Sequence, residues 1–568
     1  MKPRTIGLLS ALIVLSLLAT ACGPTPAPQV VEKEVTRVVS ETIVETVVVE
    51  GTPQVVEKVV TTTPEPTAGP AAGGTLVYII NGEPDSLDPH KTVRQDSWAV
   101  MRYVHGSLVL QDPEGNYVPY LAESWEMSED GLTWTFHLKE GITFQDGTPL
   151  TAQDVAWTYT RAKDPANPGA AGAALAAVES IEATDDLTVV MHLPQPFFPL
   201  LTSLSDPAYF GILSQKAVEA EDYGREPMGS GPYRFKEWVT GEKIVLERNP
   251  DFDWAPEYAH AGPWYFDEIE FRIIPETATQ VVSMEAGEIH VSAVSPNDVD
   301  IIRQTGLFTL YDVFQPGTGP YLQFNNAMPP LDDVRVRQAL SMAIDRDVVV
   351  KVATKGQAVP QYGPLSPATI GYWQGVDYVG YKYNLEKAKA LMEEAGYTAN
   401  ASGMLEKDGE PLQFTLKTIA GEETWLRIAE ILQEQFRALG VEVQLEQQEA
   451  GALVGDEISG NYEMGMMQVG WSDADILYQL FHSSMVGAMN MSQLSDPELD
   501  EMLTKTRTTL DPEARQQWVD DVQRYITEQA FIAPLLSALS YYAVSNDVEG
   551  EVVARTYDLL LDDAYLVK

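Results

Sequence analysis

Residues 121–155 read LAESWEMSEDGLTWTFHLKEGITFQDGTPLTAQDV, in which a strand signal is followed by a helix signal. Residues 132–138 alternate between apolar and polar side chains, which is the period-2 pattern of a half-buried β-strand. Residues 151–154 (TAQD) contain side chains that cap helices, and Val155 follows as the first large apolar residue. The segment therefore predicts a strand, a turn and then a helix.

Strand and helix signals alternate in the same way over the rest of the chain. A helix predicted over residues 384–396 starts at the N-cap Asn384, and a second helix at 425–440 carries one apolar stripe. The alternating strand 441–445 follows that second helix directly. Further strand-like runs lie at 76–80, 243–248, 269–274, 321–324, 413–419 and 464–469. The pattern predicts a mixed α/β protein, and 568 residues correspond to about three to four domains.

Composition narrows the functional class. Hydrophobic residues make up 45% and charged residues 21%, as in an ordinary soluble globular protein. The formal net charge is −46, because 83 acidic residues face only 37 basic ones. A surface of this sign repels a phosphate backbone, so we expect no nucleic-acid partner. The single cysteine excludes an intramolecular disulfide and any multi-thiolate metal site.

The N-terminus has the features of an export signal followed by a lipid anchor. Two basic residues precede an apolar run at 6–21, which is shorter than the roughly 20 residues that span a bilayer. Residues 18–23 read LATACG and resemble a bacterial lipobox, in which the cysteine is acylated and the signal is cut before it. The sequence departs from that pattern at Ala19, where leucine is usual. We therefore expect a signal peptide at 1–21 and lipidation of Cys22, with a plain secretory signal as the alternative.

Residues 22–73 are predicted to be a linker. From residue 23 onward they hold seven prolines, thirteen valines and no aromatic residue. A weak repeat relates residues 30–35 (VVEKEV) to residues 55–60 (VVEKVV). Such a composition is typical of a proline-interrupted spacer, and a short helix or coiled coil is the alternative. The folded body is expected to begin near residue 74.

Catalytic motifs are lacking. The sequence contains no Gly-x-Ser-x-Gly elbow, His-Glu-x-x-His motif, phosphate-binding loop or dinucleotide-binding glycine pattern. The nearest matches, GSGPY at 229–233 and GTGPY at 317–321, are interpreted as turns that enter strands. The seven histidines are scattered, so we expect no metal site and no cofactor. Paired carboxylates among 83 acidic residues are uninformative, and a secreted hydrolase remains only a weaker alternative.

A family resemblance extends this interpretation. Residues 121–155 closely resemble the signature of the family 5 extracellular solute-binding proteins, the oligopeptide- and dipeptide-binding components of ABC importers. Segments in the same order as in the family lie at 229–235, 247–250, 289–291, 331–347, 383–397 and 471–483. The resemblance covers roughly residues 74–568 and implies a protein that is not an enzyme.

The resemblance implies an α/β fold in the form of a two-lobed periplasmic-binding-protein clamp, of class II and the large peptide-binding type, with an extra third domain. The implied ranges are lobe I at 74–115, 228–325 and 530–568, the extra domain at 116–227, packed on lobe I, and lobe II at 326–529. Two segments that cross between the lobes, near 320–330 and 525–535, are expected to form the hinge.

The resemblance also implies where ligand binds in lobe II. Gly470 and Trp471 lie in the segment that lines the cleft in the family. Peptide-specific relatives hold the ligand's α-amino group with an aspartate three residues after this tryptophan, and here that position is Ala474. Its neighbours Asp473 and Asp475 are the candidates to bind an ammonium group instead. The alternative for Asp475 is a helix N-cap.

Lobe I contributes the facing loop. Asn81, Gly82 and Glu83 follow the first strand and are expected to contact ligand, with ordinary turn chemistry as the alternative. Three residues that either line the cleft or pack in the core are Trp98, Tyr103 and His105. Arg335 and Arg337 are expected to form structural ion pairs.

Together these patterns predict a lipid-anchored transport protein. It would capture peptides between its lobes and deliver them to the ABC permease subunits in the membrane. The same clamp binding an oligosaccharide or another polar solute is the alternative, because Ala474 replaces the expected aspartate. We expect an exported monomer on the outer face of the cytoplasmic membrane or in the periplasm.

Overall fold

The computed structural model describes residues 39–49, 52–62, 70–167, 169, 171–220, 222–554 and 559–567. The chain divides into two compact units, residues 1–69 and 70–568. The predicted signal peptide and Cys22 lie outside the described residues. No helix among the described residues is both long and apolar enough to cross a membrane.

In the first unit, two strands form an antiparallel hairpin. They are β1 (Val39–Val49) and β2 (Thr52–Thr62), with Val39 opposite Thr62. The sequence left a spacer, a helix or a coiled coil open here. The hairpin contradicts the helix and the coiled coil, and its valine content explains why, because β-branched residues favour extended backbone.

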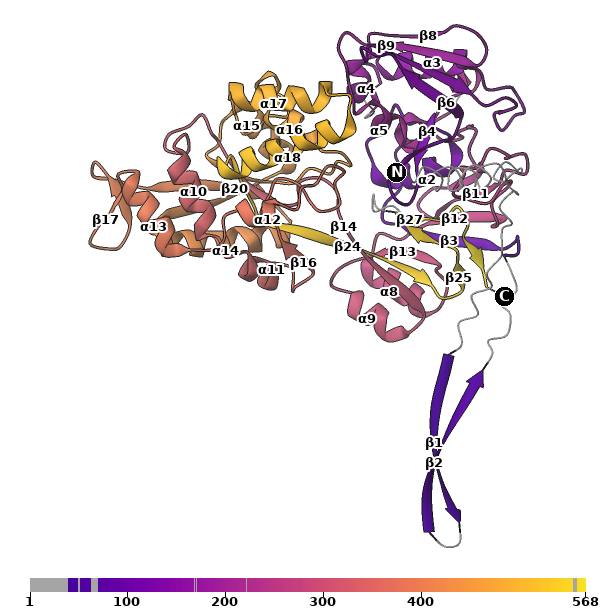
Figure 1. The fold of residues 1–568 in the computed structure, drawn as a ribbon, viewed down its shortest axis with the longest axis horizontal. Helices are drawn as coiled ribbons and strands as arrows, with labels where there is room; N and C mark the ends of the chain where they lie inside the picture. The colour runs from indigo at the N-terminus through magenta and orange to yellow at the C-terminus, as the bar shows by residue number, and fades with distance from the viewer. Residues whose placement is uncertain are drawn as a thin grey trace, which may run out of the picture. The chain divides into compact units, whose positions relative to one another are not determined.

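The second unit contains the two lobes, and Figure 1 shows β14 and β24 running between them. Lobe I is built on a sheet of order β10-β11-β12-β3-β13-β24-β14, with β16 paired to β24. The central strand β3 runs parallel to β12 and β13, while the outer pairs are antiparallel. The strands are β3 (Thr75–Ile80), β10 (Tyr233–Val239), β11 (Lys243–Arg248), β12 (Glu268–Ile273), β13 (Val291–Val294), β14 (Phe308–Phe314), β16 (Ala358–Pro360) and β24 (Leu536–Ser545).

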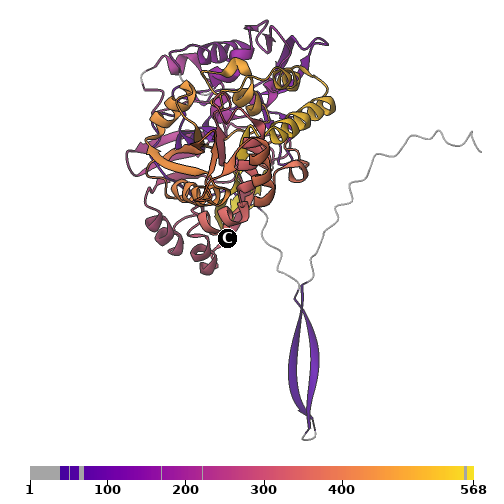
Figure 2. The ribbon, with the colours of Figure 1, turned by 90° about the vertical axis from the view of Figure 1, so that its left-hand side faces the viewer.

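Lobe II has a five-stranded sheet of order β21-β20-β22-β15-β23, and in Figure 2 its orange helices and strands face the viewer. The helix α14 (Glu423–Leu439) buries its predicted apolar stripe, including Ile428, Leu432 and Phe436. Asn384 caps α13 (Leu385–Glu394) as predicted, since its side chain accepts a hydrogen bond from the Lys387 N–H. The strands are β15 (Tyr321–Phe324), β20 (Gln413–Ile419), β21 (Glu442–Gln448), β22 (Met464–Met467) and β23 (Ile532–Pro534).

Three short strands lie on the other side of the predicted lobe boundaries. The predicted ranges assign residues 321–325 and 530–534 to lobe I, but β15 pairs with β22 and β23 in the sheet of lobe II. Conversely, β16 lies in the range predicted for lobe II but pairs with β24. The chain therefore crosses between the lobes before β15 and after β23. Sequence pattern identified the strand at 321–324 correctly, but period-2 alternation does not say which sheet a four-residue strand joins.

The extra domain has its own four-stranded sheet of order β6-β7-β9-β8. The predicted strand at 132–138 is β7 (Thr133–Leu138), which buries Trp134, Phe136 and Leu138 on one face. A capping box formed by Thr151 and Asp154 starts α3 (Ala152–Ala162), as the TAQD motif predicts. The other strands are β6 (Ala122–Met127), β8 (Ser180–Ala183) and β9 (Thr188–His192).

One apolar core runs through the extra domain and lobe I. Buried residues of both, such as Phe136 and Leu246, belong to the same cluster of packed side chains. Lobe II has two separate clusters, one around α14 and the other around the helices α16 (Ile476–Phe481), α17 (Pro497–Thr508) and α18 (Pro512–Glu528). A fourth, smaller cluster lies beneath α8 (Thr277–Glu285) and α9 (Val299–Thr305) of lobe I.

The remaining elements are helices between the sheets and short strands outside them. The helices are α2 (Gln95–Val104), α4 (Ala171–Ala174), α5 (Leu200–Leu204), α6 (Pro207–Phe210), α7 (Gln215–Val218), α10 (Val334–Ala343), α11 (Arg346–Ala353), α12 (Val376–Val379) and α15 (Ala450–Ser459). The strands are β4 (Val109–Gln111), β5 (Tyr117–Pro119), β17 (Thr398–Ala399), β18 (Leu405–Lys407), β19 (Glu410–Pro411), β25 (Val548–Glu549), β26 (Val552–Val553), β27 (Leu559–Leu560) and β28 (Tyr565–Leu566).

The two glycine-rich runs enter strands, as predicted, because β10 begins at Tyr233 and β15 at Tyr321. Both runs also touch other backbone closely. A Cβ at Gly229 would lie 2.1 Å from the Val104 carbonyl oxygen, and one at Gly317 would lie 2.0 Å from that of Val469. Glycine is required at both places because a side chain would not fit.

Candidate functional site

The segment predicted to line the cleft in lobe II follows the central strand β22 and is bound to one of the segments that cross between the lobes. The Thr318 N–H donates to the Val469 carbonyl at 2.9 Å, and the Val469 N–H donates to the Thr318 hydroxyl at 2.9 Å. Gly317 adopts φ +111°, which favours glycine. A shift of the crossing segment would therefore be transmitted directly to the backbone at Val469.

Gly470 and Trp471 are accessible parts of this segment. Gly470 is exposed, and Trp471 is half-buried against the apolar cluster around α16 to α18. The Trp471 N–H donates to the Pro316 carbonyl at 3.4 Å. The tryptophan is thus partly packed and retains an exposed portion.

Asp473 is buried, with 1% of its surface exposed, and one of its oxygens is fully used. Oδ1 accepts from Nη2 of Arg515 at 2.6 Å and from the Asp475 N–H at 2.8 Å. Oδ2 is also buried but has no hydrogen-bond partner among the described residues. A buried carboxylate oxygen without a donor is costly, so Oδ2 is the acceptor of this residue that folding leaves unused.

Asp475 differs, because Arg507 occupies both of its oxygens. Nε of Arg507 donates to Oδ1 at 2.6 Å and Nη2 donates to Oδ2 at 2.8 Å, which is the bidentate geometry of strong carboxylate pairs. Burial raises the pKa of Asp475 above its usual range, although Arg507 favours the charged form. Asp475 occupies the N-cap position of α16, as the alternative predicts, but its side chain makes no capping hydrogen bond.

The two arginines were not found by sequence reasoning. Arg507 and Arg515 lie on α17 and α18, far along the chain from the aspartates they bind. No periodicity or motif links these positions, because the pairing arises only when the two helices pack beside residues 473–475. The sequence signal was limited to the aspartates themselves.

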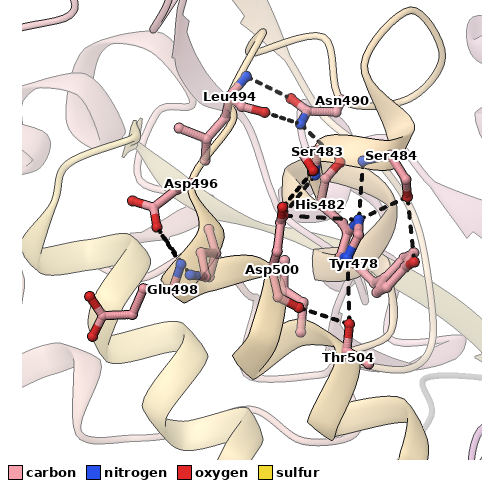
Figure 3. A network of polar contacts seen from close by, with 12 residues as sticks. Tyr478, His482, Ser483, Ser484, Asn490, Leu494, Asp496, Glu498, Asp500 and Thr504 are labelled. Carbon is pink, nitrogen blue, oxygen red and sulfur yellow. Dashed lines mark hydrogen bonds and ion pairs between the residues drawn. The ribbon is translucent and has the colours of Figure 1, made fainter.

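A Ser-His-Asp set occurs next to this segment but is not arranged for catalysis (Figure 3). The Ser484 hydroxyl lies 2.8 Å from Nδ1 of His482, and Oδ1 of Asp500 lies 3.9 Å from the same Nδ1. A catalytic relay needs the serine and the aspartate on opposite ring nitrogens. The Ser483 hydroxyl donates directly to Oδ2 of Asp500 at 2.5 Å, without the histidine between them. This network ties α16 to α17.

The facing loop of lobe I is held by partners in its own lobe. Oδ1 of Asn81 accepts from Nε2 of Gln280 at 2.9 Å, and the Gly82 N–H donates to Asp96 at 3.1 Å. Glu83 accepts from the indole N–H of a tryptophan and from a backbone N–H, and a guanidinium lies 3.8 Å away. These three partners are Trp238, Gly241 and Arg225. Both carboxylate oxygens of Glu83 are thus already bound.

For three other residues of lobe I the sequence allows either a place in the cleft or a place in the core. Tyr103 and His105 are buried, while Trp98 is half-buried with its ring centroid 4.4 Å from that of Tyr209. Nε2 of His105 lies 3.0 Å from the Tyr223 hydroxyl, and burial lowers the pKa of His105 to about 4. The core assignment therefore fits Tyr103 and His105.

Of the two predicted structural ion pairs, one is present. Arg335 binds Asp333 at 2.6 Å, as expected. Arg337 instead donates to backbone carbonyls, at 2.7 Å to Leu331 and 2.9 Å to Gln529. Its guanidinium is buried where carbonyl oxygens supply the acceptors, so the predicted ion pair of Arg337 is wrong.

No group of three or more His, Cys, Asp or Glu side chains that could hold a metal ion occurs among the residues that the structure describes. The described site consists of the segment 470–475, the arginines Arg507 and Arg515, and the loops packed around them. Its chemistry is that of hydrogen-bond donors, acceptors and one indole face.

Comparison with known proteins identifies the family. The family model described as "Bacterial extracellular solute-binding proteins, family 5 Middle" matches residues 116–487. The chain belongs to this family. The oligopeptide-binding protein AppA of Bacillus subtilis is 28% identical over 493 residues, covering 85% of this chain and 89% of AppA. The glutathione-binding protein GsiB of Escherichia coli K12 is 28% identical over 513 residues, covering 87% and 95%.

Solved structures show the same fold. The structure of AppA from Bacillus subtilis in complex with a nonapeptide has a TM-score of 0.70 and 26% identity, covering 88% of this chain and all of that chain. The predicted α/β clamp with two lobes and an extra domain is thereby confirmed, as is the resemblance to family 5. The family is described as one of bacterial extracellular solute-binding proteins.

Proposed function

We propose that this chain is the substrate-binding component of an ABC importer and captures peptides between its two lobes. The observation that carries the proposal is the similarity to an oligopeptide-binding relative over 85% of the chain. The site adds a physical reason, because the segment 470–475 offers exposed backbone, an indole face and one unused carboxylate oxygen. Such groups suit a ligand that is rich in N–H donors.

Closure of a clamp requires that ligand contacts both lobes, so that the full binding energy is available only in the closed state. To change an open-to-closed ratio from 99:1 to 1:99, ligand must bind the closed form more tightly by about 5.5 kcal/mol. A ligand of micromolar affinity has a binding free energy of about −8 kcal/mol. A peptide of ordinary affinity is therefore sufficient to drive the change, and the permease subunits can distinguish the loaded form by its shape.

Within the site we assign different roles to the two aspartates. Asp473 is the ligand contact, because its Oδ2 is buried without a partner and can accept from a peptide ammonium or amide N–H. Asp475 is a structural residue whose carboxylate is saturated by Arg507. Gly470 and Trp471 supply backbone pairing and a stacking face. Asn81, Gly82 and Glu83 contact the ligand from lobe I, on the opposite side of the cleft.

The N-terminal part of the proposal is a tether. A signal peptide at 1–21 and two or more acyl chains on Cys22 would hold the protein at the outer face of the membrane, since each buried CH₂ contributes about 0.8 kcal/mol. Replacement of Cys22 by Ser should release the chain into the soluble fraction. If the Cys22→Ser protein stays in the membrane pellet, the lipid anchor is refuted.

A second candidate ligand class is an oligosaccharide or another polar solute. It is favoured by Ala474 at the position where peptide-specific relatives carry an aspartate, and by the neutralisation of both neighbouring aspartates by arginine. A sugar would use the face of Trp471 and neutral hydrogen bonds, without an ammonium partner.

Native mass spectrometry of the purified chain separates these candidates, because tightly bound ligands remain with the protein. A bound set of masses that differ by amino-acid residues supports the peptide, and hexose spacing supports the sugar. Consumption of a chromogenic glycoside or peptide would contradict both.

The role of Asp473 is tested with two matched variants, Asp473→Asn and Asp475→Asn, each of which removes one member of a buried ion pair. The probe is the pentapeptide Ala-Ala-Lys-Ala-Ala with a free or an acetylated N-terminus, titrated by calorimetry. In the unmodified chain acetylation should weaken binding about tenfold or more, the scale of a charged hydrogen bond. That preference should disappear in Asp473→Asn and persist in Asp475→Asn. Equal affinities for both peptides in the unmodified chain would refute the assignment.

A further inference from the structure

A loop of the extra domain contacts lobe II through two phenylalanines. Phe197 and Phe198 lie between β9 and α5, and the Phe198 N–H donates to the Arg507 carbonyl at 2.8 Å. The guanidinium carbon of Arg515 lies 4.6 Å from the centroid of the Phe198 ring, and that of Arg507 lies 5.4 Å from the Phe197 ring. Each distance is within the range of a cation–π contact.

The same two guanidinium groups bind the aspartates of the ligand segment. Arg507 binds Asp475 through two nitrogens and also lies 3.5 Å from the centroid of Tyr478. Arg515 binds Asp473 at 2.6 Å, and its Nε donates to the carbonyl of Thr506 at 2.9 Å. A guanidinium can do both because its edge donates hydrogen bonds while its face stacks on a ring.

The extra domain also approaches lobe II closely at positions beside the two phenylalanines. A Cβ at Gly131 of the extra domain would lie 2.8 Å from Cδ1 of Leu510, just beyond α17. Tyr117 of β5 is also beside the pair: burial first and the charge of Asp473 second raise the pKa of its phenol to about 12. The extra domain thus meets lobe II at the residues that surround Asp473.

We propose that Phe197, Phe198, Arg507 and Arg515 form an aromatic clasp that favours the closed state and positions the Asp473 carboxylate for ligand. Phe197 is buried in the core shared with lobe I, so it moves with that lobe. When the lobes separate, both rings leave the arginines and water replaces them on the guanidinium faces. Phe197 and Phe198 are therefore positioning residues, which act on the ligand through the arginines. The closing role stands apart from the proposed function, while the positioning role rests on it.

Single-molecule energy transfer can test the clasp in the full chain, because Cys22 is its only cysteine. In a Cys22→Ser background, dyes are placed at Glu182→Cys and Glu501→Cys, two exposed positions on the extra domain and on α17. The test variant is Phe198→Ala. The matched control is Trp157→Ala, because the guanidinium carbon of Arg161 lies 5.9 Å from the centroid of the Trp157 ring, a similar contact between two residues of α3 in the extra domain.

Without ligand, the population at long dye distance should rise about fivefold in Phe198→Ala and stay unchanged in Trp157→Ala. Affinity for Ala-Ala-Lys-Ala-Ala should fall by a similar factor in Phe198→Ala and stay unchanged in Trp157→Ala. A third variant, Phe198→Leu, keeps an apolar side chain without a ring and should resemble Phe198→Ala. It also serves if the alanine variant fails to fold.

Unchanged distance distributions in both Phe198 variants would overturn the clasp. Behaviour of Phe198→Leu like the unmodified chain would also overturn it, because the aromatic face would then be unnecessary. The two proposals fail separately. If the unmodified chain does not bind the pentapeptide, the peptide function is refuted, while the ligand-free distances still decide whether the clasp holds the lobes.

Discussion

Two buried aspartates, Asp88 in lobe I and Asp473 in lobe II, show how similar ion pairs differ in use. Oδ1 of Asp88 accepts from Arg161 at 3.0 Å and from the His90 N–H at 3.0 Å, and Oδ2 accepts from Arg161 at 2.6 Å. Asp473 has an equally short contact to Arg515 but one oxygen without a partner. Both oxygens of Asp88 have hydrogen-bond partners. Asp473 keeps one oxygen without a partner, and the face of its arginine stacks on Phe198 of the extra domain.

An ion pair alone therefore does not mark a ligand site in this fold. Both aspartates are almost fully buried, and both bind an arginine from a helix far along the chain. What separates them is the number of polar atoms left over after folding. Buried ion pairs contribute little net stability, but a broken pair leaves a charge without its partner.

The largest effect is expected for Asp88→Asn. Removal of this carboxylate leaves Arg161 buried without its charge partner, so the free energy of unfolding should fall by about 3–5 kcal/mol. Urea unfolding at pH 7 measures the loss, and peptide affinity of the folded fraction should stay unchanged. A clear drop in affinity without a drop in stability would reverse the roles that we assign to Asp88 and Asp473.

A third buried carboxylate, Glu457 on α15, extends the comparison because neither of its oxygens has a hydrogen-bond partner among the described residues. Burial raises the pKa of Glu457 to about 8, so the folded chain keeps it protonated while the unfolded chain ionises above its usual pKa of 4.5. Stability is therefore lost as pH rises from 4.5 through 8. Glu457→Gln should raise the free energy of unfolding at pH 7 by about 3 kcal/mol.

The neighbouring Asp456 provides the matched control for that experiment. Hydrogen bonds from Lys417, Gln448 and Asn461 lower the pKa of Asp456 to about 2. Its stabilising contribution is present above the unfolded pKa of 3.8 and is lost as pH falls toward 2. Asp456→Asn should thus destabilise the chain at pH 7, opposite to Glu457→Gln. The same sign for both variants would contradict this reading of α15.

Lobe I should respond to acid through its buried histidines. Burial lowers the pKa of His90 to about 3 and that of His105 to about 4, both below the usual 6.5. The unfolded chain gains protons below pH 6.5 that the folded chain does not, so stability falls as pH is lowered through that value. At pH 5 the loss is about 2 kcal/mol for each histidine. His105→Gln should flatten the profile of unfolding free energy between pH 6.5 and 5.

The smallest effect is expected at the surface. Arg335→Gln removes an ion pair to Asp333 in which the arginine side chain is 43% exposed. Solvent screens such pairs, and the hydrogen bond that the Asp333 side chain accepts at the start of α10 remains. The midpoint of urea unfolding should not change measurably. A loss comparable to that of Asp88→Asn would show that exposure is a poor guide to the weight of a pair in this fold.

Much of the architecture was predictable because its signals are local. The alternation in β7, the apolar stripe of α14 and the N-cap Asn384 each depend on residues a few positions apart. The assignment of β15 and β23 to a lobe was not predictable, because strands of four and three residues carry no information about their pairing partners.

The site was predictable only in outline. The family resemblance placed Gly470 to Asp475 in the cleft, and the departure at Ala474 drew attention to its two neighbours. Which aspartate keeps an unused oxygen depends on Arg507 and Arg515, whose positions follow from the packing of α17 and α18. The role of Phe198 was hidden for the same reason, since its contacts join different domains.

The continuous core beneath the extra domain and lobe I has a mechanical consequence. Because Phe197 belongs to this core, a rotation of lobe I about β14 and β24 would carry the extra domain and its two phenylalanines along as one body. The same rotation displaces a residue farther when that residue lies farther from those strands.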